Sequence, residues 1–284
     1  MLQQTTVVTV IPYFHAFVAK WPTVQDLARA SLDEVLVEWQ GLGYYSRARS
    51  LHKCASFLAD TFPSREEDLL KLPGIGPYTA AAITSIAFGQ KAAAVDGNVI
   101  RVLSRYFALN EINPIKHIKE SLLKLLPETR CGDFTQSLME LGALVCQPKN
   151  PKCSSCPLQT DCKAYALKKV DHFPVKLPKQ KLPTRYATAF ILKREDGAIL
   201  LRKRPPHGLL GGMMEVPTTP WEDTRGEQKG RLVRHTFTHF HLEVDVQYPT
   251  DLSAFEGIWV PPQELKQYAL PTLMKKILKD TILP

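Results

Sequence analysis

Leu72-Pro73-Gly74-Ile75-Gly76-Pro77-Tyr78-Thr79-Ala80 opens an alanine-rich stretch that runs to Phe88, and the turn Val95-Asp96-Gly97-Asn98 follows it. Pro77 suits the first turn of a helix, and Gly89 suits its end. Ser64 and Glu67 have the spacing of a capping box, which predicts a short helix before the glycines. The stretch therefore predicts a helix, a glycine hairpin and a second helix, with Asp96 placed just before a third.

Gly74 and Gly76 carry no side chains, so their backbone N–H groups can approach an anion at a helix N-terminus, such as a DNA phosphate. Asp96 has two possible roles. It can cap the helix that begins near Asn98, or it can supply a carboxylate to chemistry, and the two roles are compatible.

Length and charge set outer bounds on function. A chain of 284 residues suits two domains. The formal net charge of +8 favours an anionic partner. No apolar run reaches the roughly 18 residues of a membrane helix, and no signal-peptide pattern opens the chain. We therefore expect a cytoplasmic, nucleoid-associated monomer of bacterial type that has no membrane partner.

Helical apolar spacing dominates the chain through residue 145, notably over residues 98–109, 115–126 and 134–145. Ser31 with Glu34 predicts a second capping box. We assign residues 1–165 to an all-α domain, the Lys/Pro-rich residues 166–184 to a linker, and residues 185–284 to a small α+β domain. The linker cations are expected to be solvated, with contact to DNA as the alternative.

The segment from Gly41 to Arg49 combines two glycines, the pair Tyr44 and Tyr45, and the arginines Arg47 and Arg49. An aromatic side chain can wedge into a base stack while cations meet phosphates. The alternative is that the tyrosines pack on the core and the arginines are solvated.

Four cysteines crowd into 17 positions as Cys146-x6-Cys153-x2-Cys156-x5-Cys162. A cytosolic chain rarely forms disulfides. Zinc modules usually pair short Cys knuckles across a longer gap, whereas spacings of 6, 2 and 5 suit one loop around a cubane iron–sulfur cluster. For these four cysteines we therefore favour an iron–sulfur cluster over a zinc site, and a zinc site over disulfides. Cys54 and Cys131 read as small apolar residues.

After Arg185 the sequence pattern changes from helical apolar spacing to strand-like runs. Glu195-Asp196-Gly197 lies between two apolar runs and predicts a hairpin. Residues 235–244 alternate as a single strand, residues 257–260 form another strand, and residues 272–278 form a final helix. His235, His239 and His241 read as a polar strand face, with a metal site as the weaker alternative.

Together, these motifs and Leu2-Gln3-Gln4-Thr5 resemble the helix-hairpin-helix DNA glycosylases with an iron–sulfur cluster, and among them the adenine DNA glycosylases of the MutY type. The resemblance covers nearly the whole chain. It implies a 4Fe-4S cluster on the four cysteines and double-stranded DNA with A:8-oxoguanine or A:G mispairs as partner. It further implies excision of a flipped-out adenine by hydrolysis of its N-glycosidic bond.

The resemblance also implies residue roles. Asp96 would stabilise the cationic sugar, assisted by Tyr78 and Asn98. Gln3, Gln4, Thr5, Tyr44, Arg47, Gly74 and Gly76 would contact the mispaired DNA. Phe237-Thr238-His239 would read 8-oxoguanine from a Nudix-like domain that lacks the paired glutamates of nucleotide hydrolases. Because bifunctional relatives carry a lysine where this chain has Tyr78, we expect a monofunctional glycosylase.

In the family, the segment before Leu-Gln-Gln-Thr reads Ser-Glu-Val-Met, and its glutamate is the general acid. In this chain that glutamate would lie two residues upstream of Met1 and is therefore absent from the sequence. We expect either that the start is misassigned or that the chain is a fragment. The alternative is a lesion-binding protein that recognises the mispair without excising the base. Two functions thus follow from the sequence, a glycosylase and a catalytically impaired binder.

Overall fold

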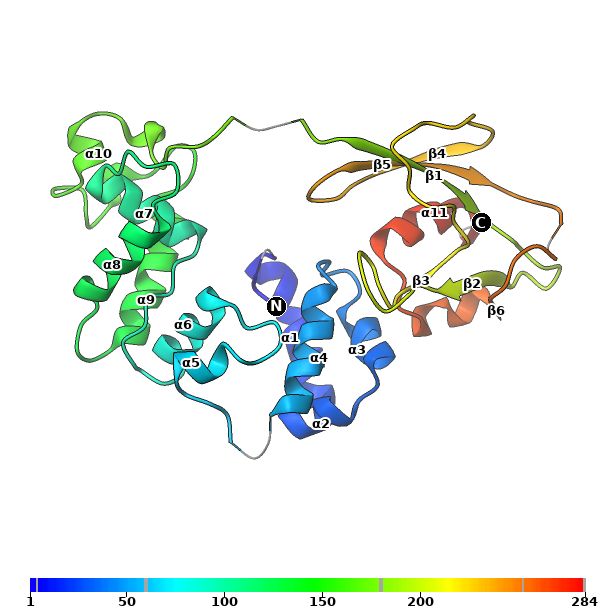
Figure 1. The fold of residues 1–284 in the computed structure, drawn as a ribbon, viewed down its shortest axis with the longest axis horizontal. Coiled ribbons are helices and arrows are strands. Elements are labelled where there is room, and N and C mark those ends of the chain that lie inside the picture. The colour runs from blue at the N-terminus through cyan, green and yellow to red at the C-terminus, as the bar shows by residue number, and fades with distance from the viewer. Residues whose placement is uncertain (4, 59–60, 179–180, 252, 283–284) are drawn as a thin grey trace. The chain divides into compact units, whose positions relative to one another are not determined.

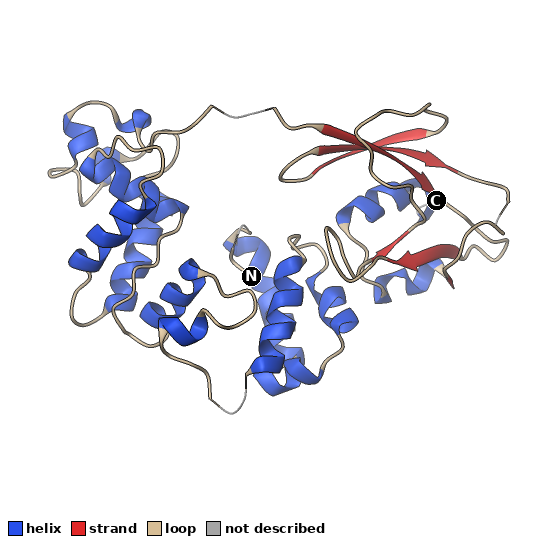
Figure 2. Ribbon diagram, in the orientation of Figure 1, coloured by secondary structure: helices blue, strands red, loops and turns tan. Residues whose placement is uncertain are grey.

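The computed structural model describes residues 1–282 apart from 4, 59–60, 179–180 and 252. Within that part, residues before 146 form helices and no strands, as the apolar spacing predicts (Figure 2). The helices are α1 (Val7–Lys20), α2 (Val24–Arg29), α3 (Leu32–Trp39), α4 (Ser46–Phe57), α5 (Glu66–Leu69), α6 (Pro77–Ile86), α7 (Gly97–Phe107), α8 (Ile115–Leu125) and α9 (Cys131–Glu140), which continues into a π-helical turn at Leu141–Val145. No described helix is long and apolar enough to cross a membrane.

Two predicted helix signals are confirmed and one is wrong. Pro77 occupies the first turn of α6, and the Ser31–Glu34 capping box closes around the start of α3. Ser64 and Glu67, however, form no capping box, because Arg65 occupies the cap position of α5 and no side chain caps that helix. The carboxylate of Glu67 instead pairs with Arg65 at 3.2 Å.

We expect Ser31→Ala to lower the free energy of unfolding by about 1 kcal/mol, because it leaves the Glu34 N–H without its partner. Thr6→Ala is the matched control, since Thr6 is an N-cap whose side chain makes no capping bond. Urea unfolding followed by tryptophan fluorescence measures both. Equal losses for the two variants would contradict the prediction.

Two small sheets follow a short helix α10 (Lys163–Ala166) and a 3-10 turn at Val170–His172. One sheet has the order β1 (Thr184–Phe190), β5 (His241–Gln247) and β4 (Arg231–Thr236), with β1 parallel and β4 antiparallel to β5. The other has the order β3 (Met214–Glu215), β2 (Ile199–Lys203) and β6 (Ile258–Val260), with both neighbours antiparallel to β2. A 3-10 turn at Pro262–Gln267 leads to the last helix, α11 (Thr272–Ile282).

The hairpin predicted at residues 195–197 is confirmed next to its turn, and one strand prediction is wrong. The turn at Glu195-Asp196-Gly197 does form, because the Gly197 N–H donates to the Arg194 carbonyl. The flanks of this turn pair briefly, because Lys193 and Ile199 form an antiparallel bridge and the Leu200 N–H donates to the Leu192 carbonyl. Farther from the turn the two strands join different sheets, since β1 pairs with β5 and β2 pairs with β6. The predicted single strand over residues 235–244 is instead two antiparallel strands, because the Phe237 N–H bonds to the Phe240 carbonyl and reverses the chain.

The chain divides into two compact units, Met1–Leu58 with Gln180–Pro284, and Ala59–Lys179 (Figure 1). We call them unit 1 and unit 2. In unit 1 the helices α1–α4 and the two sheets share one hydrophobic cluster that includes the fully buried Leu36 and Met213. Arg49 donates to the carbonyls of Gly211 and Gly208 at 2.8 and 3.1 Å. The boundaries that composition predicts, at residues 165 and 184, stay a prediction.

Candidate functional site

In unit 2, Asp96 is the N-cap of α7 and is separated by one residue from the buried run Ala92–Ala94. Its Oδ1 accepts the Val99 N–H at 2.7 Å, which is the predicted helix cap. Its Oδ2 accepts the Asn98 amide N–H at 3.0 Å. Both oxygens are thus held in place, and the partly buried carboxylate keeps one defined orientation.

Tyr78 reaches the same place from α6. Its ring packs against the small cluster of Ala81, Ala92 and Ala94. Burial, and then the negative charge of Asp96, raise the pKa of the Tyr78 phenol. The hydroxyl therefore remains protonated at neutral pH and can donate a hydrogen bond beside the carboxylate. The structure thus brings Tyr78, Asp96 and Asn98 together.

The glycine hairpin precedes this site. Gly74 adopts a φ of +76°, a conformation that a side chain would disfavour, and the Ile75 N–H donates to the Leu72 carbonyl. Gly76 occupies the N-cap of α6, and both glycines are exposed. The backbone N–H groups at the start of α6 are therefore accessible to an anion, which the predicted contact with a DNA phosphate requires.

A chain of hydrogen bonds along α7 runs from Asp96 to the cysteine loop, and the sequence reasoning missed it. Asn98 accepts the Arg101 guanidinium through Oδ1 at 2.7 Å. Arg101 also donates to the carbonyls of Cys146 and Gly142, at 2.7 and 2.6 Å. Gly142 is needed for this contact, because a Cβ there would stand 2.6 Å from the Asn98 Cβ. The signal in the sequence was the spacing of Asn98, Arg101 and Arg105 on one helix face.

The four predicted cysteines are free and partly buried. Burial raises the pKa of the Cys153 thiol, and the charges of Cys146, Cys156 and Cys162 raise it further, so the four thiols lie within electrostatic reach of one another. Across the described residues, no three His, Cys, Asp or Glu side chains are grouped so as to hold a single metal ion.

Arg105 is the second residue that the sequence reasoning missed. Its side chain is 2% exposed, and it donates to the Cys146 sulfur at 3.3 Å and to the Gln147 carbonyl at 2.7 Å. Its Nε donates to the carbonyls of Val170 and Phe173. No described carboxylate pairs with this guanidinium, so a buried positive charge faces the cysteine loop. A buried charge is costly unless an opposite charge accompanies it, and thiolates would supply one.

In unit 1 the structure separates the two tyrosines. Tyr45 is buried at 6% exposure, and its hydroxyl accepts the Gly41 N–H. Tyr44 is 42% exposed and adopts a φ of +47°, a strained conformation for a residue with a side chain. The packing alternative therefore holds for Tyr45, while Tyr44 is displayed as the wedge prediction requires.

Arg47 makes its contacts within the chain. It donates to the carbonyls of Met1 and Gln3 and to the hydroxyl of Thr5, and its guanidinium lies 5.2 Å from the Tyr44 ring centroid. Arg47 therefore contacts both Gln3 and Thr5, which are predicted to contact the mispair, and Tyr44, the predicted wedge. Gln4 lies outside the described residues.

We expect Arg47→Lys to weaken binding to mispaired DNA about tenfold, because the three acceptors are reached from two guanidinium nitrogens, whereas lysine offers one nitrogen and no planar group beside the Tyr44 ring. Binding to a fully paired duplex should change less than twofold, since the charge is kept. Fluorescence anisotropy with both duplexes at one salt concentration measures this. Unchanged affinity for both would instead assign Arg47 a purely electrostatic contact with phosphate.

Phe237, Thr238 and His239 lie at the turn between β4 and β5 in unit 1. Thr238 and His239 are exposed at the tip, whereas Phe237 is partly buried. His241 bonds through Nδ1 to the Thr236 hydroxyl at 3.0 Å, and burial lowers the pKa of His235. Among the described residues, these three histidines form no group that could hold a metal ion.

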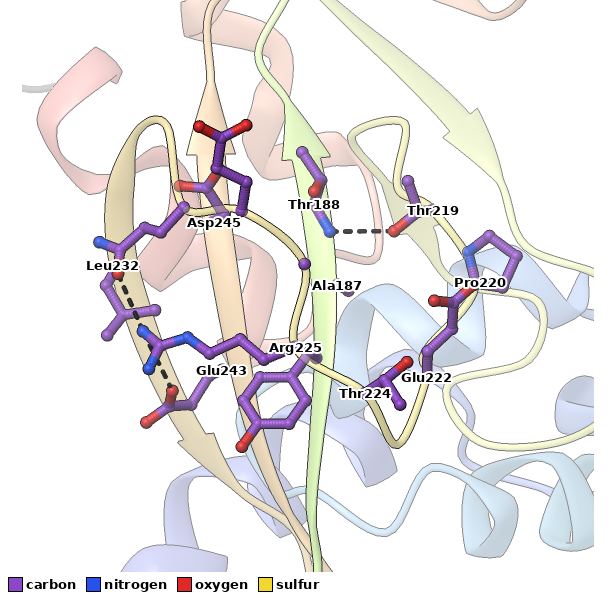
Figure 3. Close-up of a pocket in the computed structure, with 14 residues that line it drawn as sticks. Ala187, Thr188, Thr219, Pro220, Glu222, Thr224, Arg225, Leu232, Glu243 and Asp245 are labelled. Atoms are coloured by element: carbon purple, nitrogen blue, oxygen red, sulfur yellow. Dashed lines mark hydrogen bonds and ion pairs between the residues drawn. The ribbon is translucent and has the colours of Figure 1, made fainter.

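A pocket of about 180 Å³ lies over the β1–β5 face, under the loop from Thr219 to Gln228 (Figure 3). The Thr188 N–H donates to the Thr219 hydroxyl at 2.9 Å, and Arg225 pairs with Glu243 at 3.8 Å. Burial alone would raise the pKa of Asp245, but hydrogen bonds from Gln247, Lys229 and Gly230 outweigh it and lower that pKa. Glu243 and Asp245 are thus engaged in holding the loop on the sheet.

Comparison with known proteins agrees with this architecture. Residues 1–128 match the HhH-GPD superfamily of base excision DNA repair proteins, and residues 188–280 match the NUDIX domain. The adenine DNA glycosylase of Homo sapiens is 34% identical over 98% of this chain, that of Arabidopsis thaliana 38% over 86%, and that of Buchnera aphidicola from Schizaphis graminum 33% over 98%. The chain spans 66%, 46% and 88% of these relatives.

Two solved structures are similar over 58% of the chain. A thermostable thymine-DNA glycosylase aligns with a TM-score of 0.54 at 32% identity and is covered to 80% of its length. Endonuclease III in a non-covalent complex with DNA aligns with a TM-score of 0.52 at 28% identity and is covered to 79%.

Proposed function

The chain belongs to the adenine DNA glycosylase family, and we propose that it excises adenine mispaired with 8-oxoguanine or guanine, in base excision repair on the chromosome. The observation that carries this proposal is the Tyr78–Asp96–Asn98 arrangement, a held carboxylate beside a protonated phenol. The exposed glycine hairpin and the displayed Tyr44 support a DNA partner.

The residues of unit 2 suit hydrolysis of an N-glycosidic bond. The bond is out of reach inside the duplex, so the adenine must be flipped out of the stack. Its cleavage develops positive charge on the sugar, as in glycoside hydrolysis. The Asp96 carboxylate is fixed by the Val99 N–H and the Asn98 amide, so it can stabilise that charge without reorganising. Tyr78 remains a neutral donor beside it.

The site supports a monofunctional enzyme. A strand-cleaving relative needs an amine that attacks the sugar carbon and forms a Schiff base. The phenol of Tyr78 cannot form one. We therefore expect borohydride to trap no covalent adduct between this chain and a mispaired duplex, and a trapped adduct on a denaturing gel would contradict the assignment.

A 4Fe-4S cluster fits the cysteine loop. Such a cluster is held by four cysteine thiolates, and Cys146, Cys153, Cys156 and Cys162 supply that donor set within one loop. Buried Arg105 provides positive charge where thiolates and cluster would bring negative charge. When bound, the cluster would cross-link the loop and could carry an electron. Family members typically carry one.

The test of the function is an excision assay with the full chain and duplexes that place adenine opposite 8-oxoguanine, guanine or thymine. Release of adenine from the first two duplexes supports the glycosylase. Tight binding that is selective for the mispair, without release, supports the second candidate, a lesion-binding protein. If the chain neither releases adenine nor binds the mispaired duplexes selectively, both candidate functions are overturned.

A further inference from the structure

The turn between β4 and β5 has an exposed tip and an anchored root. We call residues 237–240 the reading hairpin. Thr238 and His239 form the tip and are exposed, while Phe240 is 8% exposed and Phe237 is partly buried. The Phe237 N–H donates to the Phe240 carbonyl at 2.9 Å, which closes the turn. The two phenylalanine rings, 4.9 Å apart, therefore form the base on which the tip stands.

Trp221 packs against this base from a different segment, the loop that follows β3. Its ring is stacked on Phe237, with centroids 5.4 Å apart and planes 29° apart, and it lies 5.8 Å from the Phe240 ring. Three aromatic rings that touch pairwise restrict one another's rotation, because each pair has a preferred geometry. The backbone path of the hairpin tip is thereby tied to Trp221.

Trp221 is in turn held by an arginine. The guanidinium of Arg204 lies 5.2 Å from the Trp221 ring centroid, in cation–π range, and forms a close ion pair with Glu215. Glu215 is 2% exposed and also accepts the Arg202 Nε at 3.0 Å. A buried carboxylate with two arginine partners is fixed in position. Contacts therefore run without a break from Glu215 through Arg204 and Trp221 to the reading hairpin.

We propose that Trp221 is a positioning residue that sets the ability of the reading hairpin to distinguish 8-oxoguanine from guanine. The inference rests on the proposed function, because it takes Thr238 to contact the base opposite adenine. The two bases differ in a few atoms, so distinguishing them requires the Thr238 hydroxyl to be held within a fraction of an ångström. Trp221 supplies that constraint through its contacts with Phe237 and Phe240.

The experiment measures the dissociation constants of the full chain for duplexes with adenine opposite 8-oxoguanine, guanine or thymine. The readout is the ratio of affinities for 8-oxoguanine and guanine. We expect Trp221→Ala to reduce this ratio about tenfold, the scale of losing stacked aromatic contacts, while affinity for the A:G duplex changes less than twofold. Trp221→Phe keeps a flat ring on Phe237 and should restore most of the ratio.

Trp259→Ala is the matched control. Trp259 lies on β6 in the same domain, and the Arg194 guanidinium lies 5.4 Å from its ring centroid. Among the described residues, no aromatic pair joins Trp259 to Phe237 or Phe240. It should leave the ratio unchanged. If Trp221→Ala does not fold, Trp221→Leu takes its place, since leucine keeps apolar volume without a flat ring.

The outcomes separate the inference from the function it rests on. If Thr238→Val lowers the ratio and the Trp221 variants do not, the positioning role is overturned and the function stands. An equal loss in Trp259→Ala would show a general effect on the domain and also overturn it. If the unaltered chain binds mispaired duplexes no better than A:T, the proposed function itself fails.

Discussion

Asp96→Asn is expected to slow adenine excision by about a thousandfold, the scale of removing a preorganised electrostatic group at the site where charge develops. The change removes the negative charge, and it replaces the oxygen that accepts the Asn98 side-chain N–H with an NH2 group, so that bond is lost as well. Asparagine is as good an N-cap as aspartate, so its side-chain oxygen can still accept the Val99 N–H and α7 should keep its start. Single-turnover release of adenine from an A:8-oxoguanine duplex measures the effect.

Binding provides the control for this variant. Asp96→Asn should bind the mispaired duplex within a few-fold of the original chain and unfold at a similar temperature. Asp96→Ala should be equally slow in excision but less stable by about 1 kcal/mol, because it loses the cap as well. Excision by Asp96→Asn within tenfold of the original rate would show that Asp96 is only a helix cap.

Cys156→Ser is expected to remove the iron from the protein and with it most of the binding to mispaired DNA. A serine hydroxyl does not replace a thiolate ligand of an iron–sulfur cluster. Without the cluster, the loop from Cys146 to Cys162 would lose its cross-link, and Arg105 would remain buried opposite a neutral site. The Arg101 contacts to Cys146 and Asn98 carry the disturbance to Asp96. Iron content and absorbance near 400 nm measure the loss of the cluster, and fluorescence anisotropy measures the loss of DNA binding.

Cys131→Ser is the matched control. Cys131 is fully buried at the start of α9 and donates its thiol to the Pro127 carbonyl, a bond that a serine hydroxyl can also make. It should therefore keep the iron and the DNA affinity. Zinc without iron in the original chain, or full iron in Cys156→Ser, would contradict the cluster assignment.

Much of the helical part follows from local signals. Ser31 with Glu34, and Pro77 at the start of α6, are confirmed because a cap or a fixed φ acts over three or four residues. Ser64 with Glu67 shows the limit of the same rule. The spacing is correct, but the chain enters α5 one residue later, so Arg65 rather than Ser64 takes the cap position.

The sheets were harder to predict because pairing joins residues far apart in the chain. The apolar runs beside Glu195-Asp196-Gly197 form strands, yet β1 finds its parallel partner in β5, about fifty residues later. The period-two alternation of residue types in the sequence also continues through the turn at Phe237–Phe240. A pattern of period two therefore cannot report that the chain reverses there.

The sequence by itself carries the short-range patterns: the four cysteines, the glycine hairpin and the Asp96 turn. These patterns predict a cluster loop, an anion-binding helix start and a candidate carboxylate, and they carry the resemblance to the adenine DNA glycosylases. Contacts between distant segments decide the use of individual side chains. They bury Tyr45 and display Tyr44, tie Arg47 to Gln3 and Thr5, and place Arg105 under the cysteine loop. The physical reason is that burial and hydrogen-bond partners depend on neighbours in space, which no local pattern records.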